Sequence, residues 1–369
     1  MAVLRLSTRE DFESLLLGAA LYATGGGGSI EKGLMLVKEA FLDRNRDLSI
    51  YDVEELDGED VVVSVYNVGS VAYSTKYLQQ TSWCIREALS LFNKVLGLSI
   101  GAFIPVELGA GNTAVTLYAA GVTGKPVIDG DRVGRAAPEI HQDVLLIHGK
   151  KLTPGVAVSP LGEKVIVMEY GSVDAYESIL RNLAITASGS ITVVDAPILF
   201  KEAKSIVIKN TLSRCYEVGK LVLEAMKYGK NIVSKLVEAI DGWVIFHGLI
   251  EDVVVRSKEG FLVGDIIVKG TNDFLGKKLR VWVKNEHIIA WINDEPIVMP
   301  PDLITFVDKH GVPVLNYELR KKLEVYVLAC RAPDVWRTEK GLEYFGPRHF
   351  GFDLNYIPVE KLVKNIVMT

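Results

Sequence analysis

The sequence predicts an α/β N-terminal domain with a mainly parallel sheet, joined to a β-rich C-terminal domain. Buried-strand patterns alternate with amphipathic helices over about the first 165 residues, which is typical of parallel sheets. From Gly242 onward, short apolar strands follow one another across turn sequences. The length of 369 residues fits two domains at roughly 150 residues each. We place the domains at residues 1–170 and 171–369, the second beginning with a helical connector, and expect about the last 40 residues to pack back on the first domain.

The first two predicted helices flank a run of glycines. Ser7 and Glu10 have the spacing of a capping box, and apolar residues repeat at helical period from there to Tyr22. Ser29 can cap a second amphipathic helix that extends to about Leu42. Between these helices lie Gly25, Gly26, Gly27 and Gly28.

The remaining elements follow from apolar periodicity and turn signals. In the first domain, strands are expected at residues 60–68, 98–106 and 125–128, with helices at 82–95 and 112–120. The second begins with helices at 172–187 and 212–240, the latter divided near Gly229. Strands follow at residues 243–255, 261–268, 279–284, 287–292 and 297–299. Residues 258–260 and 284–286 are expected to form hairpin turns, and the charged segment Asn285-Glu286-His287 should be solvated.

Composition and charge exclude several classes of protein. Apolar residues make up 49% and charged residues 24%, a globular balance that excludes a disordered or collagenous chain. The net charge of −5 comes without a basic tract, which argues against a nucleic-acid-binding protein. The longest uncharged run, residues 108–124, contains four Gly and three Thr, so we expect no membrane span.

The N-terminus and the cysteines predict a cytoplasmic protein. The first residues lack the basic start and the cleavage site of a signal peptide. Cys84, Cys215 and Cys330 are far apart and form no CxxC pair, which suits a reducing compartment. Only three Gln occur beside many Val, Ile, Lys and Glu, a pattern typical of a thermophile. We expect a chain of this size to form a homo-oligomer.

The glycine run allows two interpretations. One glycine suffices to end a helix, whereas four before a capping Ser leave several bare backbone N–H groups at a positive helix end. Such a turn suits a carboxylate, a phosphate or another oxyanion, so Gly25, Gly26, Gly27 and Gly28 are candidate substrate-binding residues. The alternative is a tight helix crossing that needs backbone contact. The run matches neither GxGxxG nor GxxxxGK[ST], so it is neither a dinucleotide fingerprint nor a P-loop.

The richest segment begins at Glu107, where a Gly-rich turn leads into a helix that contains Asn112. Asn112 is a candidate substrate-binding residue. Glu107 suits a general base, a metal ligand or a helix cap, and its spacing does not choose among them.

Ionisable residues then gather directly after a short strand. Asp129 and Asp131 flank Gly130 at the carboxyl end of that strand, where sites of open α/β sheets lie. Either one is a candidate general base. Arg132 and Arg135 follow and are candidates to bind a substrate carboxylate in bidentate fashion. The alternative is an Asp-Gly turn whose acids and arginines pair with one another.

Glu139 and His141 are two residues apart, so an extended chain presents both side chains on one side. An imidazole and a carboxylate placed this way suit either two metal ligands or a general base with its orienting partner. For His141 alone, a structural histidine fits equally well. His349 and Asp353 form a second candidate pair near the C-terminus.

Five segments together resemble a known family over nearly the whole chain. They read LLLGAALYATGGGGS, ELGAGNTAVTLYAAG, KPVIDGDRVGRAAPE, KNEHIIAWINDEPIVMPPDLITFVD and WRTEKGLEYFGPRHFGFDLNY. The sequence is similar to the hydantoinase-associated family of sulfur-methyl thiohydantoin desulfurase. The resemblance implies a zinc-dependent hydrolase that removes methanethiol from an S-methyl-thiohydantoin ring and leaves a hydantoin.

The chemistry suits such a substrate, because the ring carbon that bears sulfur is electrophilic and thiolate is a leaving group. Zinc lowers the pKa of bound water to about 7 and so supplies hydroxide at neutral pH. With zinc, Glu139 and His141 would be ligands, Asp129 or Asp131 the base, and Arg132 or Arg135 the partner of a substrate carboxylate. We therefore expect a metal-dependent hydrolase of a small, anionic, five-membered cyclic amidine or imide, either a desulfurase or a cyclic amide hydrolase.

The rival expectation is a protein without catalytic activity. A binding or accessory subunit of a hydantoinase- or oxoprolinase-type complex would use the glycine turn and the arginines to hold an anionic ligand. Stable association with hydantoinase-type subunits favours that interpretation, whereas release of thiol or of a ring-opened product favours the enzyme.

Overall fold

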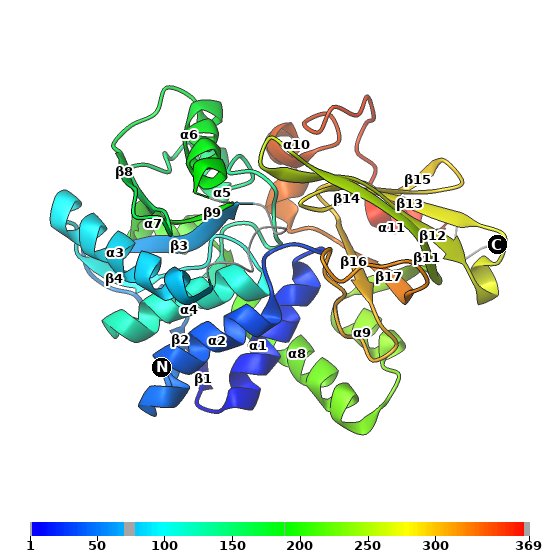
Figure 1. The fold of residues 1–369 in the computed structure, drawn as a ribbon, viewed down its shortest axis with the longest axis horizontal. Coiled ribbons are helices and arrows are strands. Elements are labelled where there is room, and N and C mark those ends of the chain that lie inside the picture. The colour runs from blue at the N-terminus through cyan, green and yellow to red at the C-terminus, as the bar shows by residue number, and fades with distance from the viewer. Residues whose placement is uncertain (1, 70–77, 188, 365–369) are drawn as a thin grey trace.

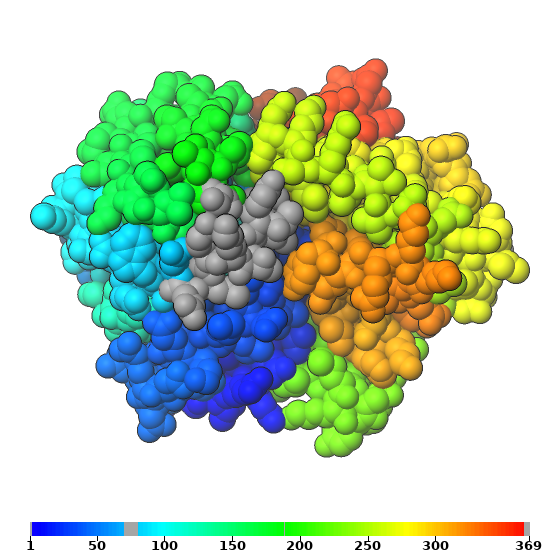
Figure 2. Space-filling model, in the orientation of Figure 1, coloured from blue at the N-terminus to red at the C-terminus, as the bar shows by residue number. Residues whose placement is uncertain are grey.

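The structure is a computed structural model that describes residues 2–69, 78–187 and 189–364. Its two large sheets, one per domain, lie at opposite ends of the molecule (Figure 1). In the space-filling view, blue-to-green segments of the first domain meet yellow and orange segments of the second (Figure 2). The predicted fold class, an α/β region followed by a β-rich region, is confirmed.

The first sheet has eight strands in the order β1-β2-β5-β4-β3-β9-β7-β8. Its centre, β2-β5-β4-β3, is parallel, and the other neighbours are antiparallel. The strands are β1 (Leu4–Leu6), β2 (Leu48–Tyr51), β3 (Val61–Gly69), β4 (Ile100–Phe103), β5 (Val127–Ile128), β7 (Gly155–Val158), β8 (Lys164–Val167) and β9 (Ser190–Leu199). Strand β9 is not predicted from sequence. It comes after the expected domain boundary, yet it pairs with β3 over nearly its whole length.

Helices cover both faces of this sheet. Helices α3 and α4 pack on one face with α1, α2 and α8 beyond them, and α6 packs on the other (Figure 1). Their bounds are α1 (Arg9–Tyr22), α2 (Ile30–Ala40), α3 (Leu78–Leu96), α4 (Ala110–Thr123), α6 (Val173–Thr186) and α8 (Thr211–Tyr228). Helix α1 has a capping box, but at Thr8 and Asp11, one residue beyond the predicted pair. Ser29 caps α2 as predicted, accepting a hydrogen bond from the Lys32 N–H.

Short elements connect these larger ones. Strands β6 (Gly130–Asp131) and β10 (Ile208–Lys209) form a two-stranded ribbon. The short helices are α5 (Val144–Ile147), α7 (Phe200–Ile206) and α9 (Val233–Ala239). The predicted division of the 212–240 helical region is present, because α8 ends at Gly229 in the left-handed conformation.

The second sheet has seven strands, all antiparallel, in the order β15-β14-β13-β12-β11-β17-β16. The strands are β11 (Gly242–Lys258), β12 (Phe261–Gly270), β13 (Lys278–Lys284), β14 (Glu286–Ile292), β15 (Glu295–Val298), β16 (Leu303–Val307) and β17 (Glu324–Cys330). Five of them correspond to predicted strands. Strands β16 and β17 lie after the last predicted strand and complete the sheet.

The C-terminal segment, with α10 (Glu339–Phe345) and α11 (Val359–Leu362), contacts both domains. Trp336 is fully buried and its Nε1 donates a hydrogen bond to the Val133 carbonyl at 2.6 Å. Gln142 Nε2 donates to the Tyr344 carbonyl at 3.0 Å. These contacts tie residues after the second sheet to the first domain. No helix in the described part of the chain is both long and apolar enough to cross a membrane.

Candidate active site

A cavity of about 350 Å³ lies where the first domain meets the turn between β13 and β14. This volume is within the range of small-molecule sites. From the first domain, the glycine run, the first turn of α4, the end of β3, the start of β9 and the 137–143 segment line the cavity, and the second sheet contributes the rest of the wall. The lining residues include Gly27, Gly28, Glu107, Asn112, Glu139 and Glu286. Of the site residues predicted from sequence, the fold therefore brings Glu107, Asn112, Glu139 and part of the glycine run to one cavity.

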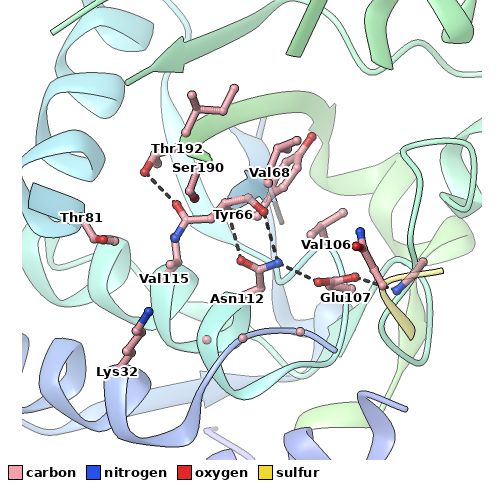
Figure 3. A pocket seen from close by; sticks show the side chains of 18 of the residues that line it. Lys32, Tyr66, Val68, Thr81, Val106, Glu107, Asn112, Val115, Ser190 and Thr192 are labelled. Carbon is pink, nitrogen blue, oxygen red and sulfur yellow. Dashed lines mark hydrogen bonds between the residues drawn. The ribbon is translucent and has the colours of Figure 1, made fainter. Parts of the chain in front are cut away.

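Glu107 follows β4 and is buried in the cavity wall. Its Oε1 accepts a hydrogen bond from Asn112 Nδ2 at 2.7 Å, and its Oε2 accepts one from the Ala137 N–H at 2.8 Å (Figure 3). Burial raises the pKa of Glu107 to about 7, against the lowering effect of these two donors. A carboxyl with this pKa exchanges protons at neutral pH, as a general base does.

Asn112 fixes the orientation of that carboxyl. Its Oδ1 accepts from the Asn67 N–H at 3.0 Å, so its Nδ2 must point toward Glu107 (Figure 3). Asn67 is held in turn, because its Oδ1 accepts from Thr192 Oγ1 at 2.8 Å. The network joins α4, β3 and β9, and it leaves Glu107 little freedom to turn.

Glu286 is the site residue that the sequence analysis missed. It was expected in a solvated turn, and that expectation is wrong: Glu286 is 3% exposed and His287 is fully buried. The turn is present, but it docks on the glycine run, where the His287 N–H donates to the Thr24 carbonyl at 2.8 Å. A Cβ on Gly26 would lie 2.0 Å from Glu286 Oε1, so a larger residue at this position would force the carboxyl to move.

The environment of Glu286 favours its protonated form. Burial and the charge of Glu107 raise the pKa of Glu286 well above its usual value. Among the described residues, its Oε2 has no hydrogen-bond partner although it is buried. A buried carboxyl oxygen without a partner, on the wall of a cavity, is where a ligand group or a water molecule would bind.

The glycine run serves as a close backbone contact and as cavity wall. The Gly27 carbonyl accepts from the N–H groups of Gly111 at 2.9 Å and Asn112 at 3.1 Å. A Cβ on Gly27 would lie 2.5 Å from the Gly109 Cα. The tight backbone contact considered from sequence is thus present. The N–H groups at the start of α4 donate to the Gly27 carbonyl and are not available to a ligand. Binding of an oxyanion by this run remains a prediction.

The aspartates of the 129–135 segment bind backbone N–H groups of the protein and are not part of the cavity wall. Asp129 Oδ1 accepts from the Ser213 N–H at 2.9 Å, in the first turn of α8. Asp131 Oδ2 accepts from the N–H groups of Val133 and Gly134. Burial raises the pKa of Asp131 to about 7. Neither predicted base shares the cavity with Glu107.

The two arginines are also engaged by the protein. Arg132 lies 3.3 Å from Asp143 and 3.4 Å from Asp195, and all three are buried. Arg135 is fully buried and uses all five guanidinium N–H groups. Its acceptors lie in both domains and are the carbonyls of Ala136, His287, Pro301 and Asp302 and Thr24 Oγ1, at 2.8–3.0 Å. Arg135 therefore joins the two domains through these hydrogen bonds.

Glu139 and His141 do not meet a third side chain that would complete a metal site with them among the described residues. Glu139 contacts Lys284 Nζ and accepts from His349 Nε2 at 2.6 Å. Burial alone would raise its pKa, but His349 and Lys284 hold the pKa of Glu139 well below its usual value. His141 Nε2 instead lies 3.1 Å from Asp174. His349 thus pairs with Glu139, and Asp353 lies beside Arg348 at 3.5 Å.

This arrangement does not fit the zinc site that the resemblance implies. An ammonium beside Glu139 occupies the position where a cation would bind. Among residues 2–69, 78–187 and 189–364, no group of three or more His, Cys, Asp or Glu side chains is placed to hold a metal ion. Structural and catalytic zinc sites use at least three protein ligands. Zinc binding stays a prediction.

Comparisons with known proteins agree with the resemblance. The family description "S-Me-THD-like, N-terminal domain" matches residues 10–169, and "S-Me-THD-like, C-terminal domain" matches residues 172–359. A search of curated proteins finds no match. A crystal structure of a protein from Chromobacterium violaceum shares the fold, with a TM-score of 0.79 and 19% identity over 97% of this chain and 100% of that chain. The chain belongs to the S-Me-THD-like family, that of S-methyl-thiohydantoin desulfurase.

Proposed function

We propose that the protein is a hydrolase of a five-membered cyclic amidine or imide, of the S-methyl-thiohydantoin or hydantoin kind, with Glu107 and Glu286 as its acid–base pair. Family membership supports the substrate class. One observation carries the assignment of the pair: two buried carboxyls from different domains line one cavity, and one of them has an oxygen without a partner among the described residues.

The different environments of the two carboxyls support different roles. Glu107 accepts two hydrogen bonds, which favour its ionised form and suit a base. Glu286 sits beside that charge in a buried position, which favours its protonated form and suits an acid. Two carboxyls whose environments separate their pKa values are a common acid–base arrangement in hydrolases.

The reaction balances with these two groups alone. The oxygen of water forms a bond to the ring carbon that bears sulfur, while Glu107 takes one water proton and Glu286 gives its proton to the ring nitrogen. The intermediate collapses as the C–S bond breaks. Glu107 then passes its proton to the leaving sulfur, releasing methanethiol, and the hydroxyl proton returns to Glu286 as the carbonyl forms. Both carboxyls end as they began.

The test is turnover of a panel of S-methylated thiohydantoins and hydantoins that differ in the ring substituent. Thiol release is followed with a thiol reagent, and mass spectrometry in heavy-oxygen water shows whether one solvent oxygen enters the product. We expect thiol and labelled hydantoin in equal amounts for at least one compound. The same assay after chelation, with elemental analysis of the protein, determines whether zinc is present and needed.

The outcomes separate this proposal from its rival. Tight binding of a ring compound without thiol release or ring opening would instead support a binding or accessory subunit. Ring opening without thiol release would support a cyclic amide hydrolase. Failure of the whole panel to bind would contradict the substrate class.

A further inference from the structure

Asn67 lies near the end of β3 and forms part of the cavity wall. It stands directly opposite Thr192 of β9 in the antiparallel pairing of these strands, so the two side chains lie on one face of the sheet. Thr192 is buried, and its Oγ1 donates a hydrogen bond to Asn67 Oδ1 at 2.8 Å. This contact occupies the oxygen side of the Asn67 amide and fixes its orientation.

The nitrogen side of that amide is not engaged by the protein. Within the described part of the chain, Asn67 makes hydrogen bonds through its backbone and its Oδ1, and its Nδ2 donates to no group. The neighbouring amide of Asn112 differs, because its Oδ1 and its Nδ2 both have partners. Since Asn67 is half-buried on the cavity wall, its Nδ2 can meet a group bound in the cavity. An amide nitrogen donates and does not accept, so it selects an acceptor such as a carbonyl oxygen.

Hydrogen bonds connect this amide to the proposed base. Asn112 accepts from the Asn67 N–H at 3.0 Å and donates to Glu107 at 2.7 Å, so a single side chain links Asn67 to Glu107 (Figure 3). A five-membered ring is small enough to contact both. In an S-methyl-thiohydantoin, one ring nitrogen separates the carbon that bears sulfur from the ring carbonyl. With the first of these carbons at Glu107, the carbonyl can point toward Asn67.

We propose that Asn67 is a specificity-determining residue whose Nδ2 donates a hydrogen bond to the carbonyl oxygen of the substrate ring. Thr192 is a positioning residue, because its hydroxyl holds the amide with the nitrogen toward the ligand. This inference rests on the proposed function, since it takes a five-membered ring with its reacting carbon at Glu107. A ring without that carbonyl leaves the Asn67 donor unpaired and therefore binds more weakly.

The test compares two neutral rings by calorimetry, hydantoin and imidazolidin-2-one, which lacks the carbonyl in question and keeps the other. For the wild-type protein we expect hydantoin to bind about fivefold more tightly, as for one neutral hydrogen bond. Asn67→Ala should bring the two affinities to within about twofold, and Thr192→Val should give an intermediate preference. Asn182→Ala is the matched control and should keep the fivefold preference, since Asn182 is exposed on α6 and donates to the Ser178 carbonyl of its own helix at 2.7 Å.

A purely structural role of Asn67 would weaken the binding of both rings alike and leave the preference between them unchanged. That result in Asn67→Ala, or equal binding of the two rings by the wild-type protein, would overturn the inference while leaving the proposed function intact. An unchanged preference in Thr192→Val would overturn the positioning role of Thr192. Failure of the folded wild-type protein to bind either ring would contradict the proposed function itself, whose product is a hydantoin.

Discussion

Glu107 and Glu286 face one cavity from different domains, and burial together with the charge of Glu107 raises the pKa of Glu286. In water, each of these carboxyls would have the ordinary pKa of a glutamate side chain. Their burial at a domain junction makes each depend on the other's protonation state, and this dependence gives rise to most of what the account predicts.

The first prediction concerns the pH dependence of turnover. Burial raises the pKa of Glu107 to about 7, so the base is protonated at lower pH and ionised above it. We expect kcat/KM to rise between pH 6 and 8 with an apparent pKa near 7 that belongs to the coupled pair. Initial rates of thiol release across that range check this. A rate that is constant from pH 5 to pH 8 would contradict the role of Glu107 as base.

The second prediction concerns stability. The folded protein keeps Glu286 protonated to a higher pH than the unfolded chain does, so its contribution to stability is full below the unfolded pKa and is lost as pH rises through the folded pKa. Glu286→Gln removes that loss. We expect it to be more stable than wild type at pH 8 and nearly equal to it at pH 4.

Denaturant unfolding at the two pH values measures this difference. Glu295→Gln in the exposed part of β15 is the control and should change neither value. Equal stability of wild type and Glu286→Gln at pH 8 would mean that Glu286 is ionised without cost in the folded protein.

The third prediction uses the contact between Gly26 and Glu286. Gly26→Ala would place a Cβ 2.0 Å from Glu286 Oε1, so the carboxyl must move. We expect at least a tenfold loss in kcat with the fold retained, because catalytic groups tolerate little displacement. Gly171→Ala is the control, since a Cβ there meets open space. Normal turnover by Gly26→Ala would show that the position of Glu286 is unimportant.

The fourth prediction separates a structural from a substrate-binding role for Arg135. A lysine cannot replace five donors, so Arg135→Lys leaves buried carbonyls of both domains unpaired. We expect a loss of about 3 kcal/mol in the free energy of unfolding. Arg320→Lys on the exposed surface should be neutral. If Arg135→Lys instead keeps its stability and loses only substrate affinity, the role predicted from sequence is correct.

Local patterns predicted much of the fold. The Ser29 cap, the break at Gly229 and the alternation of β3, β4 and β5 with helices depend on neighbours in sequence, and they were found. Strand β9 was missed because its partner β3 lies more than 100 residues away in sequence. No local signal records such a pairing.

The same contrast between local and distant contacts explains why the site was predicted only in part. Glu107 and Asn112 belong to one turn and one helix, so their proximity follows from sequence. Glu286 was missed because a charged turn is usually solvated, and only the docking of that turn on Gly25–Gly28 buries it. A local signal did exist, since four consecutive glycines indicate that something approaches the backbone closely.

The most direct test of the central claim is thiol release by Glu107→Gln and Glu286→Gln, measured on the best compound of the panel beside wild type. We predict that each variant stays folded, binds the ring compound, and loses at least about 100-fold in kcat, as expected when a general acid or base is removed. Turnover by either variant within a few-fold of wild type would contradict the assignment of that carboxyl to the acid–base pair.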